Sequence, residues 1–118
     1  MEQQNIKKAS ILGVPVSLTT IDQLTEQIHS DLDQAQKRFI IAINPEKVMK
    51  ARKDPKLSVL LNKADYAIAD GIGILWASRI YGKPIKERVT GIDCMQRLCR
   101  VAQNRGSRVF LYGAHPDI

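Results

Sequence analysis

The chain has 118 residues, the usual size of one domain, and 44% of them are hydrophobic and 25% charged, a composition that excludes a disordered or low-complexity protein. The formal net charge of +6 favours anionic partners such as phosphorylated metabolites or a membrane surface. One Trp, three Tyr and two Phe are too few to stack single-stranded nucleic acid, so no nucleic-acid partner is expected. Without a signal peptide or an apolar run of membrane-spanning length, the chain is expected to be cytoplasmic, or at most peripheral at the inner face of the plasma membrane.

The N-terminal part predicts a small antiparallel element. Residues 1–9 are polar and expected to be flexible. Two short apolar runs follow within residues 10–18, and Gly13 and Pro15 interrupt them. This pattern indicates a hairpin or an edge strand.

A helix is predicted to begin after Thr20, because Thr20 and Gln23 have the spacing of a capping box. The side chains expected to share the inner face of this helix are Ile21, Leu24, Ile28 and Leu32. The run "RFIIAIN", residues 38–44, is then too short for a helix and too apolar for an edge, so it predicts a central strand.

Two short helices are predicted next. Pro45 suits the first helical position and opens a helix over residues 46–52. The stretch "DPKLSVLLNKAD", residues 54–65, forms the second helix. Its inward residues are expected to be Leu57, Leu60 and Leu61.

The remaining elements continue the alternation. Residues 66–69, "YAIA", predict a buried strand, and a helix is expected from Gly73 to about Tyr81. Thr90 and Asp93 then give a second candidate capping box for a helix that ends at Gly106. Its inward face is expected to hold Ile92, Met95, Leu98, Cys99 and Ala102.

The stretch "SRVFLYGAH" predicts a third buried strand that ends in Gly113. Strands alternating with helices predict an α/β fold, with a mostly parallel sheet covered by helices on both faces. A sheet of three strands leaves an edge to cover. We therefore expect residues 1–118 to be part of one larger domain, or to depend on a homo-oligomer.

Three groups of residues follow the predicted strands, where open parallel sheets bind ligands. They are Asn44-Pro45-Glu46, Asp70-Gly71-Ile72-Gly73 and Tyr112-Gly113-Ala114-His115. Asp70 can act as a general base there, or it can simply cap the following helix. Asn44 can contact a ligand or serve as a turn residue before a proline. The glycines let a ligand approach the backbone. The pair Gly71 and Gly73 is only a weak signal for dinucleotide binding, because Trp76 stands where the third glycine of the fingerprint would fall.

A basic loop and two cysteines complete the chemically notable residues. Lys83, Lys86 and Arg88 lie in "YGKPIKERVTG", and Arg88 precedes a helix start, an arrangement suited to phosphate recognition, although such charges also serve as a solvated face. Cys94 and Cys99 lack the spacing of metal ligands, so no metal site is expected, and they indicate buried thiols in a reducing compartment.

The segments "NPEKVMKAR", "ADYAIADGIGILWASR" and "ERVTGIDCMQRLCRVAQNRGSRVFLYGA", in this order and spacing, resemble the WecG/TagA/CpsF glycosyltransferase family over about residues 11–117. Members of that family make bacterial surface polymers, and among them are the N-acetylmannosaminyltransferases of wall teichoic acid synthesis. The resemblance implies a Rossmann-like, inverting enzyme that needs neither a metal nor another cofactor. It implies transfer of an aminosugar from a UDP-sugar to N-acetylglucosamine on undecaprenyl diphosphate.

The resemblance also implies roles for individual residues. Asp70 corresponds to the proposed base, Asn44 to a substrate contact and Arg88 to a motif arginine that offsets phosphate charge. Gly71, Gly73 and Gly113 are expected to line the same substrate site.

This chain departs from the family's pattern in two respects. It has Ala42 where members often carry threonine, and the family domain is about twice as long, with a C-terminal part that targets the membrane surface. The alternative hypothesis is a non-catalytic remnant that binds a nucleotide or a lipid diphosphate together with another chain.

Overall fold

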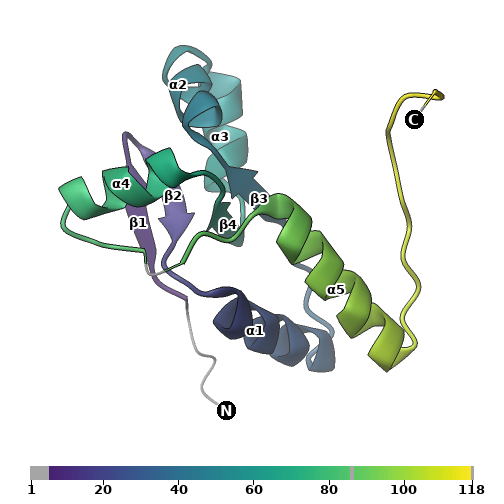
Figure 1. Cartoon of the computed structure of the whole chain (residues 1–118). Helices are drawn as coiled ribbons and strands as arrows, with labels where there is room; N and C mark the ends of the chain where they lie inside the picture. The colour runs from purple at the N-terminus through teal and green to yellow at the C-terminus, as the bar shows by residue number, and fades with distance from the viewer. Residues whose placement is uncertain (1–5, 86, 118) are drawn as a thin grey trace.

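The computed structural model describes residues 6–85 and 87–117, and within them it forms an α/β fold of two small sheets and five helices (Figure 1). Lys86 of the basic loop lies outside the described residues. Of the segment expected to be flexible, residues 1–5 also lie outside them, whereas Lys8 and Ala9 belong to the first strand.

The predicted hairpin is confirmed. Strands β1 (Lys8–Ile11) and β2 (Val14–Ser17) pair antiparallel, and the two residues between them, Leu12 and Gly13, have positive φ angles of 49° and 84°. A two-residue hairpin turn of this kind matches the twist of the strands on either side. The hairpin packs beside the second sheet, where the Ala67 N–H donates to the Ser17 hydroxyl.

Helix α1 (Ile21–Asp33) begins with the capping box that the sequence predicts. The Gln23 N–H donates to Thr20 Oγ1, and the Thr20 N–H donates back to Gln23 Oε1, each over 3.2 Å. These two bonds satisfy backbone donors that a helix start otherwise leaves without a partner.

The second sheet consists of two parallel strands, β3 (Ile40–Ile43) and β4 (Tyr66–Ala69). Helices α2 (Pro45–Lys53) and α3 (Pro55–Asn62) connect them, as predicted. The expectation that β3 is a central strand is wrong for the described residues, because β3 pairs only with β4 and its other edge is open. Apolar composition indicates that a strand is buried but does not identify its neighbours.

Helices cover both faces of this sheet, as predicted. On one face, Ile43, Ala67 and Ala69 join a core with the hairpin, α2, α3 and α4 (Ile72–Ile80). On the other face, Ile68 and the half-buried Ala42 meet α1 and α5 (Gly91–Arg105). The alternation of side chains along each strand therefore divides the interior into two clusters.

Some residues that the helical pattern placed in the core are exposed. They are Leu32, Leu60, Ile92, Met95 and Cys99. In α5 the buried side chains are Cys94 and Val101, so its inner face is rotated relative to the predicted one. An apolar residue adds to a core only where another element covers it.

The prediction of a third strand is wrong. Residues 107–117 form no strand, and after Gly106, whose φ of 69° ends α5, the chain turns back and runs apart from the sheet (Figure 1). Side chains of this segment, including Phe110 and Tyr112, are exposed. A β-prone run becomes a strand only when a ladder partner lies beside it, and no strand of the described residues pairs with this run.

Candidate functional site

The candidate site lies at the carboxyl ends of β3 and β4. Ile43 and Ala69 are opposite each other in the parallel ladder, and the Asp70 N–H donates to the Ile43 carbonyl over 2.8 Å. Asn44 and Asp70 therefore leave the sheet side by side, at the same rim. The predicted placement of Asn44 and Asp70 at one rim is confirmed, and their role in binding or catalysis stays a prediction.

Gly113 is not part of this rim, which corrects the prediction. It belongs to the exposed segment after α5, which runs apart from β3 and β4 (Figure 1). The prediction depended on a third strand that would end there, and that strand is absent from the described residues. His115 lies in the same segment, beside Asp117.

Asp70 is half-buried, and its carboxylate holds the start of helix α5. Asp70 Oδ2 accepts a hydrogen bond from the Gly91 N–H over 3.1 Å. Gly91 is the first residue of α5, where the helix dipole favours a negative charge. No other hydrogen bond to this carboxylate is found within the described residues, so Oδ1 is available to a hydroxyl group.

The alternative that Asp70 caps α4 is wrong. Gly71 is the N-cap residue of α4, and no side chain caps this helix start. Gly71 has φ 114° and ψ 142°, a backbone conformation that is essentially restricted to glycine. The chain therefore turns sharply after Asp70, and the carboxylate is directed to α5 instead.

Gly73 permits close contact between the two helices that leave the rim. A Cβ atom at residue 73 would lie 2.9 Å from Cγ of Pro45. A Cβ at Gly91 would lie 3.4 Å from the Cβ of Ala42 and 3.5 Å from Asp70 Oδ2. These glycines have a packing role at the rim.

Asn44 has a structural role that the sequence did not assign to it. Its Oδ1 accepts from the Lys47 N–H over 2.9 Å, so Asn44 is the N-cap of α2. Lys47 itself is a site candidate that sequence reasoning missed. Its ammonium group, partly buried, donates to the Ala42 carbonyl over 2.6 Å and brings a cation to the rim. The signal was its place three residues after Asn44, in the first turn of a helix at a strand end.

Arg88 lies near the rim but lines another cavity. The Val89 N–H donates to the Ala69 carbonyl, so the chain before α5 crosses the end of β4. The exposed Arg88 makes no ion pair within the described residues. It borders a surface cavity of about 290 Å³ together with Arg97 and Arg100, and neither Asn44 nor Asp70 lines this cavity.

A second cavity, of about 340 Å³, adjoins the rim at Gly91 and Ala42. It lies between the sheet, α5 and the C-terminal segment, and it is largely apolar. Cys94, one of its lining residues, is buried, and burial raises the pKa of its thiol. Within the described residues no three His, Cys, Asp or Glu side chains gather in a way that could hold a metal ion.

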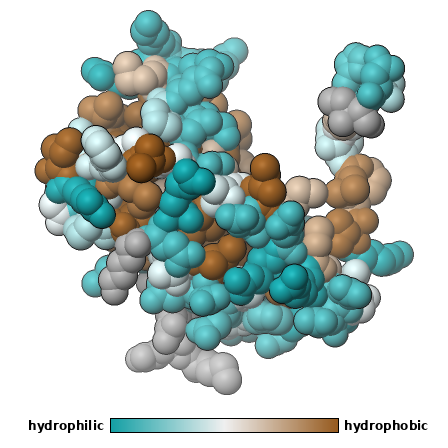
Figure 2. Space-filling model, in the orientation of Figure 1, coloured by the Kyte–Doolittle hydropathy of each residue, from teal (hydrophilic) through white to brown (hydrophobic). Residues whose placement is uncertain are grey.

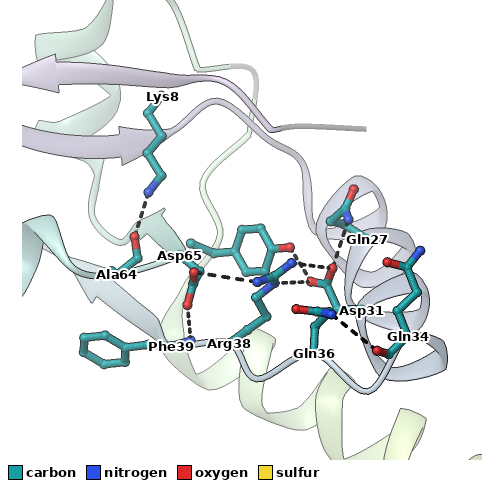
Figure 3. A network of polar contacts seen from close by, with 10 residues as sticks. Lys8, Gln27, Asp31, Gln34, Gln36, Arg38, Phe39, Ala64 and Asp65 are labelled. Carbon is teal, nitrogen blue, oxygen red and sulfur yellow. Dashed lines mark hydrogen bonds and ion pairs between the residues drawn. The ribbon is translucent and has the colours of Figure 1, made fainter. Parts of the chain in front are cut away.

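A polar network lies at the opposite end of the sheet, around the buried Asp31 (Figure 3). Its carboxylate accepts hydrogen bonds from the Tyr66 hydroxyl, from Gln27 and from Arg38, with the Arg38 Nε 3.1 Å from Oδ2. Burial opposes ionisation of Asp31, but these hydrogen bonds outweigh it and lower its pKa. Since Tyr66 begins β4, this network is remote from the rim and joins α1 to the sheet.

The sequence of the chain is similar to those of known proteins. The model of the Glycosyl transferase WecG/TagA/CpsF family matches residues 9–118. The N-acetylglucosaminyldiphosphoundecaprenol N-acetyl-beta-D-mannosaminyltransferase of Staphylococcus aureus is 34% identical over 99% of this chain and 47% of its own length. The enzyme of that name from Bacillus spizizenii is 39% identical over 70% of this chain and 32% of its own length. The chain thus spans less than half the length of these curated relatives.

Proposed function

Because the chain belongs to the WecG/TagA/CpsF glycosyltransferase family, we propose that the protein containing it transfers an N-acetylmannosamine-type sugar from a UDP-sugar to N-acetylglucosamine on undecaprenyl diphosphate. This reaction belongs to teichoic acid synthesis, at the inner face of the plasma membrane. In the proposed protein, the parallel pair β3–β4 is part of a larger Rossmann-like sheet. The observation that carries the proposal is Asp70, at the sheet rim with one carboxylate oxygen held and the other available.

The proposed mechanism is a single displacement that inverts the anomeric centre. Asp70 takes the proton from the acceptor's 4-hydroxyl, and the oxygen attacks the anomeric carbon of the donor. The bond between that carbon and the diphosphate breaks, and UDP leaves with the electron pair. Neither a metal nor another cofactor takes part in the proposed chemistry.

The surrounding residues position these groups. The Gly91 N–H fixes Asp70 Oδ2, which leaves Oδ1 as the proton acceptor. Arg88 supplies positive charge for a diphosphate near the end of β4. Asn44, Gly71 and Gly73 shape the rim on which the substrates lie. Their direct contact with substrate is part of the proposal.

Asp70→Asn tests the proposed function. An asparagine oxygen can still accept the Gly91 N–H, so the melting temperature should change little, but the base is lost. Turnover should fall by about a hundredfold or more, as is usual when a general base is removed. The measurement is the steady-state rate of UDP release with donor and lipid-linked acceptor.

Asp54→Asn is a matched control, because Asp54 caps α3 and accepts from two backbone N–H groups away from the rim. Asparagine is about as good a cap, so this variant should remain active and stable. Full activity of Asp70→Asn would refute the base assignment. A wild-type protein that binds the UDP-sugar and releases no UDP would support the non-catalytic alternative instead.

A further inference from the structure

Helix α4 has an exposed apolar stripe that no element covers within the described residues. Ile72, Trp76 and Ile80 are 61%, 64% and 85% exposed, and their spacing of four places them along one side of the helix. The opposite side, with Ile74 and Ser78, is buried. Figure 2 shows hydrophobic surface at this side of the molecule, over α4. Single exposed apolar residues are ordinary, but a stripe marks an interaction surface.

The charged residues of α4 and of the segment that follows it are all positive. From Gly71 to Ile85 the sequence has no Asp or Glu, although the whole chain has 12 such residues. Arg79 and Lys83, at the C-terminal end of α4 and just after it, are both exposed. An apolar helix face that is flanked only by cations is complementary to a surface with an apolar interior and anionic groups at its contact with water.

We infer that the outer face of α4 docks on an anionic phospholipid membrane. Trp76 and Ile80 enter the boundary between headgroups and acyl chains, where tryptophan is favoured because its ring is apolar and its N–H is polar. The exposed Tyr81 suits the same depth, and Arg79 and Lys83 meet the lipid phosphates. The helix lies on the membrane and does not cross it, since no helix in the described part of the chain has the length and apolar character of a membrane span.

A second copy of the chain fits this face less well. A two-fold contact through α4 would place Arg79 and Lys83 of both copies at the interface, and this part of the sequence offers no carboxylate to pair with them. Like charges brought together at an interface oppose association. The charge pattern therefore favours the membrane.

The position of α4 links this surface to the candidate site. The helix begins two residues after Asp70, so its docked face adjoins the sheet rim. An acceptor held in the membrane by its lipid would present its sugar next to Asp70. This link rests on the proposed function, whereas docking itself is independent of catalysis.

The test compares two double variants of the protein containing this chain. Trp76→Ser with Ile80→Ser removes the stripe, and Met49→Ser with Val59→Ser removes two side chains of comparable exposure, 52% and 56%, from α2 and α3. Co-sedimentation with vesicles of phosphatidylglycerol and phosphatidylcholine should fall about tenfold or more for the α4 variant and remain at the wild-type level for the control. Pure phosphatidylcholine vesicles and high salt should each weaken wild-type binding.

Trp76 supplies a second signal. Vesicles should shift its fluorescence to shorter wavelength, and this shift should be lost in Trp76→Phe while vesicle binding is kept. The α4 double variant should also retain transfer to a short-chain, water-soluble acceptor and lose transfer to acceptor in vesicles. Loss of both transfers together with normal vesicle binding would count against the link to the site.

The docking inference is overturned if the α4 double variant binds vesicles like the wild type. If that variant instead converts a dimer to a monomer in sedimentation equilibrium without altering vesicle binding, the partner of α4 is a second copy. If it unfolds while the control does not, α4 is covered by another part of the protein, and this also refutes docking.

Discussion

Gly73 is the residue at which the two helices leaving the sheet rim come into contact. A Cβ added there would approach the Pro45 ring to 2.9 Å, and a proline ring cannot rotate away. Gly73→Ala should therefore lower the free energy of unfolding by about 1–3 kcal/mol, the usual cost of overpacking. Denaturant titration measures this change.

A double-mutant cycle identifies the cause. Pro45→Ala removes the Cγ atom that the new methyl group would meet, so Gly73→Ala should cost less in a Pro45→Ala background than in the wild type. Equal costs in both backgrounds would show that the destabilisation does not come from this contact.

The residues at the rim show what a sequence can predict of a site. The placement of Asn44 and Asp70 at one rim could be predicted because each follows an apolar run that predicts a strand, and the carboxyl ends of parallel strands lie at the same edge of a sheet. The bond from Gly91 to Asp70 joins residues 21 positions apart, and no local pattern encodes it. The role of Asp70 as a cap was a reasonable alternative, and it failed because Gly71 turns the backbone first.

Among the elements, α1 and the sheet are joined by apolar packing and by the polar network around Asp31 and Tyr66 (Figure 3). Tyr66→Phe removes one of the donors to a buried carboxylate. The buried Asp31 carboxylate then lacks one of the hydrogen bonds that offset its loss of hydration. The free energy of unfolding at pH 7 should therefore fall by about 1–3 kcal/mol. Tyr112→Phe, at an exposed position, is the matched control and should leave stability unchanged.

The same pair predicts how stability depends on pH. Burial, followed by the hydrogen bond to Asp31, raises the pKa of Tyr66 from 10.0 to about 12. The folded protein therefore keeps a proton that the unfolded chain releases, so stability falls as the pH rises from about 10 to 12. The pKa of Asp31 is lowered, so its contribution is present above its ordinary value of 3.8 and is lost as the pH falls below it.

Tyr66→Phe should thus flatten the stability profile between pH 10 and 12. Guanidinium unfolding midpoints across this range, for wild type and variant, provide the measurement. An unchanged slope in the variant would mean that other groups cause the alkaline loss of stability.

For the helices and strands, the sequence predicted where an element forms more accurately than it predicted which face of that element is buried. Helix starts such as those of α1 and α2 have a local signal, the Thr20 capping box in one and Pro45 at the first helical position in the other. The exposure of Ile92 and Met95 has no such signal, because it depends on where neighbouring elements lie. Helical periodicity alone cannot supply this information.

For the whole molecule, the main difference from expectation is the segment after α5. Its composition is typical of a strand, but residues 108–116 have no backbone hydrogen bond to the sheet. Amide hydrogen exchange in this segment should therefore be fast, while the amides of β4 should be protected. Mass-spectrometric exchange on the protein containing this chain, with peptides from β4 as the internal reference, measures both. Protection of Val109, Phe110 and Leu111 would contradict the open arrangement.

The open edge of β3 has a consequence for preparing this polypeptide. Because the Ile43 carbonyl is bonded to the Asp70 N–H on the β4 side, the alternation of a strand directs the Ala42 carbonyl to the open side, where the Lys47 ammonium covers it. The sequence of β3, "IIAI", has no charge or proline of the kind that keeps strand edges from self-pairing. Concentrated solutions of the isolated 118 residues would therefore aggregate by strand addition between molecules, starting at β3.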